Sequence, residues 1–446
     1  MRRVPHIAAH QLSSNSRVLA LNVTAHPGTG QDFMVGVPPT RMTMADHALA
    51  GLRIIECGQM VSAAYATKLM ADLGAEVIKI ESPQSGDLAR RRGPFPGGTP
   101  HPEKSGLFLY LNTNKRGITL DLRHHRGQEL LHRLAGEADL LVHNVGPQEM
   151  AAHGIDFSAL SQLNPRLVLT SITPFGLTGP HCNYQATDLT LWNAGGVAYL
   201  NGGGPQAADL PPLKAFGQQS EFQGGLNAAV AALGALLARR RTGAGQHVSI
   251  SIQECVAAIL ELAFEFWPYM GLVASRLGQK PIQPLDFLEC RDGWIFLCCV
   301  EEHQWRTWVE IMGNPEWADM ELFENRLTRA ANWDALKLLL QEWVQERSVE
   351  ELYHAGQARR VPLAPVSTMA DLLRSDHLKT RGFFATIEHP QAGRLQYPGG
   401  PYHFSATPWS IRRPAPLLGQ HNNEVYTQQL GLSADELSAL RAHGVV

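Results

Sequence analysis

The sequence predicts an α/β protein built on a mostly parallel sheet. Short apolar runs typical of strands alternate with helical patterns from residue 52 to residue 170, so that each helix separates two strands. The chain has 446 residues, which exceeds the size that a single hydrophobic core serves well. A second, smaller domain is therefore expected beside the one that contains the parallel sheet.

The strand and helix alternation occupies the first half of the chain. Residues 52–56 and 76–80 have the β-branched content of buried strands, and a helix is expected between them at 63–73, ending at Gly74. The alternation then continues with helices expected at 127–137 and 157–163 and strands at 139–142 and 167–170. Parallel strands need crossover connections, so helices are expected to cover both faces of the sheet.

The composition and rhythm of the chain change after about residue 262. A buried strand is expected at 293–300, directly after a turn at 291–293. Helices rich in tryptophan and glutamate are expected at 304–311 and 333–345. We interpret this region as the smaller domain.

The charge and composition exclude several classes of protein. With 44% hydrophobic residues, 18% charged residues and a net charge of -3, the chain is typical of globular proteins and has no long-range field that would attract nucleic acid or an anionic membrane. Its six cysteines lack CxxC or Cys/His ligand spacing, which favours a reducing cytoplasm. Any polyanionic ligand must therefore be held by a local cluster of bases.

No membrane-spanning or secretory segment is expected. The most apolar stretch, 226–238, is shorter than the ~20 residues that a span requires and ends in three arginines, so it is interpreted as a buried helix. Residues 1–43 lack a convincing signal sequence. They are expected to be a disordered N-terminal extension, or to result from a start codon assigned too far upstream.

Common catalytic motifs are absent from the sequence. It contains no HExxH, no P-loop, no GxSxG and no GxGxxG with its acidic partner, and its nineteen histidines have no ligand spacing. We therefore expect no metal site and no tightly bound cofactor.

Several separated motifs resemble the family III CoA transferases, the CaiB/BaiF or formyl-CoA transferase-like family. They occur in the family's order between about residue 49 and residue 446, and they include LMADLGAEVIKIE, LNTNKRGITLDL, DLLVHN, NPRLVLTSITPFGLTGP, DLTLWNAGG and TGAGQHVSISIQE. The resemblance implies a large Rossmann-like domain from residues 44–262 and 370–446, a small domain at 263–369, and a homodimer whose two chains interlock. It also implies acyl-CoA and carboxylic acid substrates, with CoA as a substrate group.

The resemblance places Glu221 at the position of the family's nucleophile. In the family an aspartate lies four residues before a glycine at the entrance of an Ala/Leu-rich helix, and Glu221 and Gly225 occupy those places here. We expect the helix to begin near Gly224, with its N-terminus keeping the carboxylate ionised near the usual pKa of ~4.3. The extra methylene of glutamate moves the attacking oxygen by ~1 Å, a displacement that can reduce turnover by about 10²-fold. A purely structural acid therefore remains the alternative.

The family's CoA-binding positions are only partly retained. Gly86, Asp87, Arg90, Leu120 and Asn144 match positions that line the CoA site. The family's three phosphate-binding bases and a site histidine are replaced by Ser82, Ala152, Gln185 and Gln59. The basic groups at 90–92 and 115–116 are candidate replacements, because arginine and lysine bind phosphate, although solvated loops would have the same composition.

Three functions follow from these residues. The first is transfer of CoA between an acyl-CoA and a carboxylic acid, with Glu221 as nucleophile. The second is a catalytically silent subunit that pairs with a paralogue carrying the aspartate. A racemase or isomerase is less favoured, because Thr187 stands where related racemases have a histidine before the acid that corresponds to Asp188. Asp188 is expected to be structural, as a cap for the helix that follows it.

Overall fold

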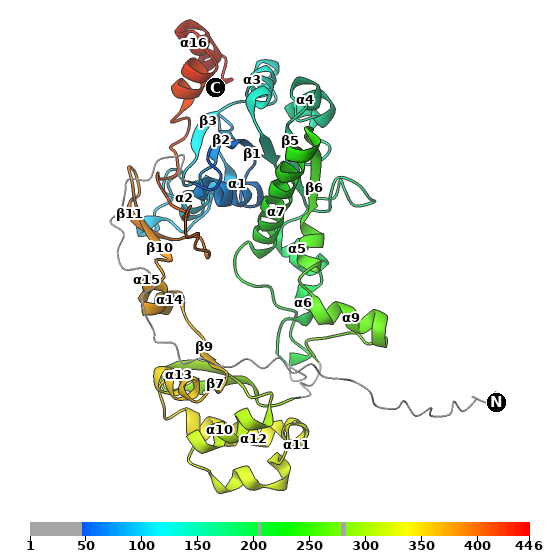
Figure 1. The fold of residues 1–446 in the computed structure, drawn as a ribbon, viewed down its shortest axis with the longest axis vertical. Coiled ribbons are helices and arrows are strands. Elements are labelled where there is room, and N and C mark those ends of the chain that lie inside the picture. The colour runs from blue at the N-terminus through cyan, green and yellow to red at the C-terminus, as the bar shows by residue number, and fades with distance from the viewer. Residues whose placement is uncertain (1–46, 204–206, 278–281) are drawn as a thin grey trace, which may run out of the picture. The chain divides into compact units, whose positions relative to one another are not determined.

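A computed structural model describes residues 47–203, 207–277 and 282–446; the predicted N-terminal extension at 1–43 lies outside these residues. Six parallel strands form a sheet in the order β3-β2-β1-β4-β5-β6 (Figure 1). The strands span Arg53–Cys57 (β1), Glu76–Glu81 (β2), Arg116–Thr119 (β3), Leu140–His143 (β4), Val168–Thr173 (β5) and His247–Ser251 (β6). The predicted α/β class and parallel sheet are confirmed.

The strand order reverses direction at the centre of the sheet. β1 pairs with β2 on one side and with β4 on the other, so that Ile54 is aligned with both Val77 and Leu140. In an open parallel sheet, such a reversal separates the loops that follow the two strands and leaves a crevice at their carboxyl ends. The loops after β1 and β4 are therefore the place where the fold itself provides room for a ligand.

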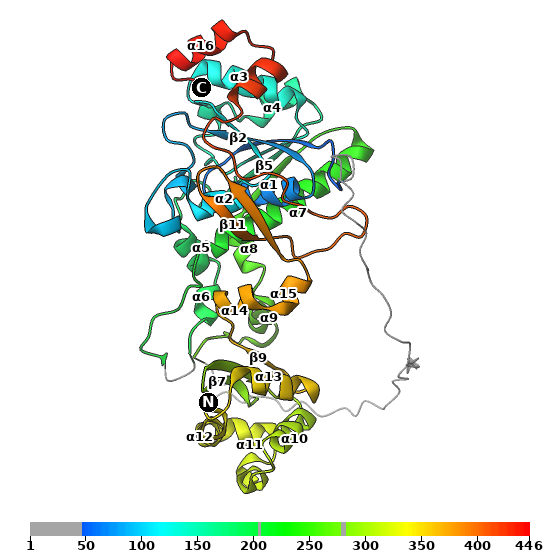
Figure 2. The ribbon, with the colours of Figure 1, turned by 90° about the vertical axis from the view of Figure 1, so that its left-hand side faces the viewer.

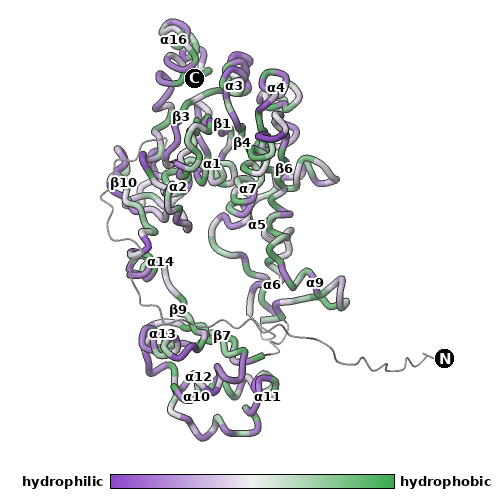
Figure 3. The backbone as a smooth tube through the Cα atoms, in the orientation of Figure 1, coloured by the Kyte–Doolittle hydropathy of each residue, from purple (hydrophilic) through white to green (hydrophobic). Residues whose placement is uncertain are grey.

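Helices cover both faces of the sheet. The helices α1 (Ser62–Asp72) and α7 (Gln219–Thr242) pack on one face, and α3 (His125–Glu137), α4 (Phe157–Leu163) and α16 (Ala434–Ala442) pack on the other. Successive strand residues point to opposite faces of the sheet, which explains this arrangement. Ile54 and Val77 belong to the core beneath α1 and α7, and Ile55 and Ile78 belong to the core beneath α3, α4 and α16. The strands are correspondingly among the more hydrophobic segments of the chain (Figure 3).

The two strands that the apolar pattern did not predict lie at the edges of the sheet. β3 has the sequence RGIT and β6 the sequence HVSIS, and four of the five residues of β6 are not fully buried. An edge strand packs less apolar surface than a central one, so its sequence carries a weaker hydrophobic signal. The helix α7 likewise begins at Gln219, earlier than the predicted start near Gly224.

Residues 285–365 contain an antiparallel sheet with its own core. Its strands are β7 (Leu285–Cys290), β8 (Gly293–Cys298) and β9 (Leu363–Pro365), and its helices are α10 (Glu302–Ile311), α11 (Arg326–Ala331), α12 (Trp333–Val344) and α13 (Val349–Ala358). Trp308, Leu336 and Leu340 are buried in this core. The strand and both helices predicted in this region are present within a few residues of the expected bounds, whereas the predicted domain boundaries remain predictions.

The C-terminal part of the chain packs against the parallel-sheet region. After α14 (Met369–Arg374) and α15 (Asp376–Thr380), the hairpin of β10 (Phe384–His389) and β11 (Gly393–Pro398) lies beside α2 (Gly106–Leu111), as Figure 2 shows. Tyr397 of β11 belongs to the same buried cluster as Phe108 of α2. Further on, the Tyr426 hydroxyl donates to the Thr119 carbonyl at 2.7 Å. The other α-helices of the described residues are α5 (Asp188–Ala194), α6 (Val197–Leu200), α8 (Ile252–Ala257) and α9 (Glu261–Met270).

Candidate active site

The loop of residues 58–61 turns sharply from β1 into α1. A Cβ atom added at Gly58 would lie 2.3 Å from the Cβ of Ala63, so this turn requires glycine. Met60 adopts a φ of 61°, a left-handed conformation that is rare for a residue with a side chain. Its N–H donates to Asp87 Oδ1 at 2.8 Å, and Asp87 thereby holds the loop in its strained shape.

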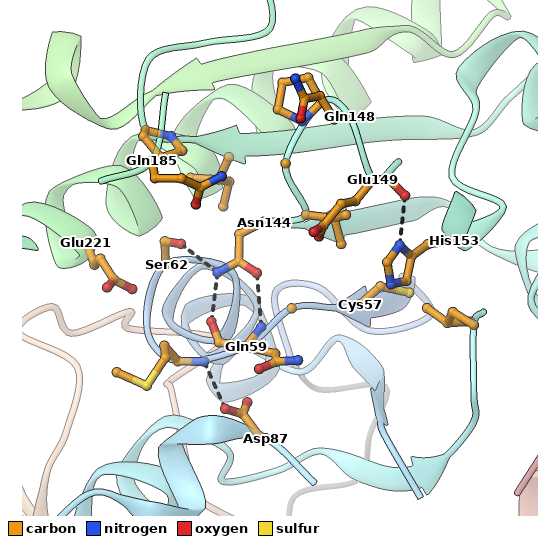
Figure 4. Close-up of a pocket in the computed structure, with 18 of the residues that line it drawn as sticks. Cys57, Gln59, Ser62, Asp87, Asn144, Gln148, Glu149, His153, Gln185 and Glu221 are labelled. Atoms are coloured by element: carbon orange, nitrogen blue, oxygen red, sulfur yellow. Dashed lines mark hydrogen bonds between the residues drawn. The ribbon is translucent and has the colours of Figure 1, made fainter. Parts of the chain in front are cut away.

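Asn144 connects the loops that follow β1 and β4. Its Oδ1 accepts from the Gln59 N–H at 3.0 Å, while its Nδ2 donates to the Gln59 carbonyl at 2.7 Å and to Ser62 Oγ at 3.1 Å (Figure 4). The amide therefore satisfies both backbone groups of Gln59, as a neighbouring strand would. This contact fixes one side of the crevice at the centre of the sheet.

Glu221 lies in the first turn of α7 and points toward the same loop (Figure 4). Its Oε2 accepts from the Val61 N–H at 3.2 Å. Burial raises the pKa of Glu221, the backbone N–H groups of Val61 and Ser62 lower it, and the charges of Asp188 and Asp87 raise it, with a net pKa of about 7. The expectation of a carboxyl ionised near its usual pKa is therefore wrong, because burial outweighs the backbone donors.

Close packing of α7 on α1 brings the Glu221 carboxylate to this loop. A Cβ atom at Gly225 would lie 2.6 Å from the Ser62 carbonyl oxygen, and one at Gly224 would lie 2.8 Å from Ile252 Cγ1. Neither position has room for a side chain. The glycine four residues after Glu221 thus allows the helices to approach closely enough for Glu221 to accept from the Val61 N–H.

Asp188 supports α7, not its own helix. The side chain of Thr187 caps α5, in a capping box with Thr190, so the predicted capping role of Asp188 is wrong. Asp188 Oδ1 accepts from the Glu221 N–H at 3.1 Å, and Asp188 Oδ2 forms an ion pair with Lys214 at 2.8 Å. Asp188 therefore satisfies a free backbone donor in the first turn of α7 and fixes the backbone of Glu221.

A fully buried group of charges lies beneath the loop of residues 58–61; we call Glu56, Lys79, Asp87 and Lys115 the ionic layer. Lys79 Nζ lies 2.7 Å from both Glu56 and Asp87, and Lys115 Nζ lies 2.8 Å from Glu56. Burial by itself would raise the pKa of Glu56, but the charges of Lys115 and Lys79 lower it to about 2. The two lysines balance the two carboxylates, and the layer gives Asp87 a fixed position under Met60.

These elements enclose a cavity of about 840 Å³ at the carboxyl edge of the sheet. Residues at or just beyond the end of every strand line it, namely Gly58 after β1, Ser82 after β2, Leu120 after β3, Asn144 after β4, Pro174 after β5 and Ile252 after β6. Its volume lies within the range of about 300–1,000 Å³ that is usual for small-molecule and cofactor sites. Glu221 and Asp188 form part of its wall.

Most of the site residues indicated by the sequence meet in this cavity. Glu221, Gly86, Asp87, Leu120 and Asn144 all line it. Positions where the resembling family has a base or a site histidine line it as well, and they carry the neutral side chains of Ser82, Ala152, Gln185 and Gln59.

Arg90 and Lys115 do not reach the cavity. The guanidinium of Arg90 donates to Glu81 at 2.6 Å and to Glu103 at 2.6 Å, and its side chain is 1% exposed. Lys115 belongs to the ionic layer and is also buried. The hypothesis that these two bases replace the family's phosphate-binding residues is wrong, because both already have internal carboxylate partners.

Two basic residues that the sequence did not single out line the cavity instead. Arg123 is exposed and forms an ion pair with Asp121 at 3.2 Å, and His153 lies on the opposite side of Asn144 from Glu221 (Figure 4). The available signal for Arg123 was its position three residues after Leu120, since the end of an edge strand in this fold faces the crevice.

All six cysteines are free. Among residues 47–203, 207–277 and 282–446, no group of His, Cys, Asp and Glu side chains has the arrangement of a metal site. No helix within these ranges is long and apolar enough to span a membrane.

Comparison with known proteins identifies a family over most of the chain. Residues 49–422 match the model of CoA-transferase family III. The chain is 34% identical to a succinyl-CoA:(R)-benzylsuccinate CoA-transferase subunit, BbsE, of Thauera aromatica (86% of this chain, 94% of the relative), and 29% identical to a formyl-CoA:oxalate CoA-transferase of Streptomyces coelicolor (90% and 100%). The crystal structure of a CaiB/BaiF family protein from Brucella suis is similar, with a TM-score of 0.77 and 30% identity (86% and 99%).

Proposed function

The chain belongs to CoA-transferase family III, and we propose that it moves CoA from an acyl-CoA donor to a carboxylic acid acceptor with Glu221 as the nucleophile. The observation that carries this proposal is the position of the Glu221 carboxylate. It lies in the wall of a cavity of suitable size, at a helix N-terminus, with no basic side chain bound to it among the described residues. A carboxylate paired with a cation would be a poorer nucleophile.

The proposed reaction has four steps. A carboxylate oxygen of Glu221 attacks the thioester carbonyl, forming a C–O bond and expelling CoA thiolate, which gives a mixed anhydride. The thiolate then attacks the Glu221 carbonyl, so that the donor acid leaves and a glutamyl-CoA thioester remains. The acceptor carboxylate attacks this thioester and again expels CoA thiolate. The thiolate finally attacks the acceptor's carbonyl, releasing the new acyl-CoA and restoring Glu221.

The backbone of the loop before α1 supports this role. Val61 N–H already donates to Glu221 Oε2 at 3.2 Å. When the Glu221 carbonyl is attacked, negative charge develops on its oxygen, and a fixed N–H donor stabilises that charge. The ionic layer fixes Asp87, and Asp87 accepts from the N–H of Met60, the residue before Val61. The position of the Val61 N–H donor is therefore set before substrate binds.

The cavity is proposed to bind the CoA part of the substrate through Gly86, Asp87, Leu120 and Asn144. Arg123 supplies positive charge for the phosphates, and His153 lines the same cavity. Ser82, Ala152 and Gln185 contribute no charge, so binding should depend only weakly on salt. Replacing Arg123 by alanine should weaken CoA binding and flatten this salt dependence further, as calorimetry at two ionic strengths would measure.

Trapping of the covalent intermediate tests the proposal. After incubation with an acyl-CoA, hydroxylamine or borohydride should modify Glu221 alone, because only an anhydride or thioester carboxyl is reactive enough. Peptide mass spectrometry detects the modification, and Glu221→Gln is the matched control. Glu221→Asp should lower turnover by about 10²-fold with little change in CoA binding. Turnover by a wild-type enzyme whose Glu221 stays unmodified would contradict the proposal.

A subunit of a heteromeric transferase is the second candidate, because the Thauera aromatica relative is itself a subunit. The exposed aromatic side chains of α9, including Phe264, Trp267 and Tyr269, would be covered in a dimer with a second copy or with a paralogue. If the chain alone neither turns over nor forms the intermediate, but activity appears when a paralogue with aspartate at this position is added, the subunit role replaces the first proposal. The free cysteines support a cytoplasmic location for either form.

A further inference from the structure

Tyr184 is an exposed aromatic residue in the wall of the cavity. The wall segment from Cys182 to Asp188 lines the cavity along its whole length, and Tyr184 is 58% exposed within it. Among the described residues that line the cavity, Tyr184 carries the only phenyl or phenol ring. Most of the other lining side chains are short, charged or amides, so this ring is the main flat apolar surface that the cavity offers to a ligand.

Two other rings hold Tyr184 in place. The rings of His181 and Tyr184 are stacked, with centroids 4.6 Å apart and planes 22° apart. Phe175 contacts both edge-on, at 5.9 Å from His181 and 6.3 Å from Tyr184, and it packs against the core formed by α1, α7 and the sheet. Neither His181 nor Phe175 lines the cavity. The supporting rings therefore lie behind Tyr184.

The backbone also fixes the ring. Tyr184 N–H donates to the His181 carbonyl at 2.8 Å, which closes a turn between the two stacked residues. A ring that is already ordered loses little conformational entropy when a ligand stacks on it, so more of the contact energy remains as affinity. A single exposed tyrosine on a convex surface needs no explanation, whereas an ordered one inside a ligand cavity has the geometry of a stacking surface.

We propose that Tyr184 stacks against a planar aromatic group of the bound thioester. This inference rests on the proposed function, since it assumes that the cavity binds acyl-CoA. Two parts of such a ligand have the required chemistry, namely the adenine base of CoA and an aromatic acyl group. Both present a flat π-surface, and the experiment separates them.

The test compares Tyr184→Ala, Tyr184→Phe and wild type by calorimetry with four ligands: CoA, 4′-phosphopantetheine, benzoyl-CoA and butyryl-CoA. Removing a stacked ring should weaken binding by about 10-fold, and phenylalanine should restore it to within about 2-fold. Tyr199→Ala is the matched control, because Tyr199 is 54% exposed but does not line the cavity. Tyr199→Ala should leave the affinity for each of the four ligands unchanged.

If Tyr184→Ala binds CoA, benzoyl-CoA and butyryl-CoA more weakly than wild type but binds 4′-phosphopantetheine equally well, adenine is the stacked group. If only the affinity for benzoyl-CoA falls, the stacked group is the acyl group. The inference is overturned if Tyr184→Ala changes every affinity by less than about 2-fold, or if Tyr184→Phe loses as much as Tyr184→Ala. If wild type binds none of the CoA ligands, the proposed function itself fails and this inference fails with it.

Discussion

The ionic layer contains a fully buried glutamate, Glu56, and the cavity wall contains a partly buried one, Glu221, and the two have opposite pKa shifts. Burial by itself raises the pKa of both carboxyl groups. Lys115 and Lys79 lower the pKa of Glu56 to about 2, whereas Glu221 has only backbone donors and neighbouring acids, and its pKa rises to about 7. Burial therefore leaves a carboxylate ionised when cations accompany it and favours its protonated form when they do not.

The largest expected effect comes from breaking the ionic layer. Lys79→Met leaves Glu56 and Asp87 without their shared partner, and it should reduce the free energy of unfolding by about 3–5 kcal/mol, because uncompensated buried charge is costly. Urea denaturation would measure this. Arg126→Met, which removes an exposed pair with Glu129, is the control and should cost less than about 1 kcal/mol. Similar effects for the two variants would show that the layer is not structural.

Glu221→Gln should have the opposite effect on stability. The folded-state pKa of Glu221 lies above the unfolded value of 4.5, so the folded state holds the proton more tightly and loses stability as pH rises from about 4.5 through about 7. Removing the carboxylate should therefore stabilise the protein by up to about 3 kcal/mol near pH 8, with no gain near pH 4. Turnover should fall by roughly 10³-fold or more.

The matched change in the ionic layer, Glu56→Gln, should destabilise the protein at neutral pH. If Glu56→Gln and Glu221→Gln change stability in the same direction at that pH, the contrast between the two glutamates is wrong. Urea denaturation at two pH values gives the comparison directly.

Gly225→Ala should separate α7 from α1. The added Cβ atom would lie 2.6 Å from the Ser62 carbonyl oxygen, and overpacking of this kind costs about 1–3 kcal/mol. The shift also moves Glu221 away from Val61 N–H, so turnover should fall together with stability. Gly234→Ala in the same helix is the control, because no atom lies within 4 Å of the added Cβ, and it should stabilise the helix by roughly 0.5–1 kcal/mol. Equal effects from the two substitutions would contradict the packing argument.

The pH dependence of turnover tests whether Glu221 must be ionised to react. A nucleophilic carboxyl must be ionised, so kcat/KM should fall about 10-fold for each unit of pH below about 7 and level off above it. Steady-state rates between about pH 5 and pH 9 would show the midpoint. A midpoint near the ordinary glutamate value would mean that Glu221 is solvated during the reaction.

The smallest expected effect comes from Asp188→Asn. The charge of Asp188 helps to raise the pKa of Glu221, so the midpoint of the pH profile should move to lower pH. Asparagine retains an oxygen that can accept from Glu221 N–H, so the start of α7 should remain in place. A midpoint that stays in place or moves to higher pH would contradict the contribution of the Asp188 charge to the raised pKa of Glu221.

The central strands could be predicted from the sequence because they depend on a local pattern, since apolar runs specify strands that are buried on both faces. The candidate role of Glu221 followed instead from the resemblance to the family, in which an acid lies four residues before a glycine. The edge strands β3 and β6 gave a weaker signal, since fewer of their residues need to be apolar.

The sequence by itself thus determined the fold class, the family and several of the residues that gather at the carboxyl edge of the sheet, namely Glu221, Gly86, Asp87, Leu120 and Asn144. Only the tertiary structure decided what each charge does. Arg90 and Lys115 have the composition of phosphate-binding residues but are paired with internal acids, while Arg123 lines the cavity. The pKa of a carboxyl depends on burial, on backbone N–H donors and on nearby charges, and these come from residues far apart in the chain, such as Val61 and Asp87 for Glu221.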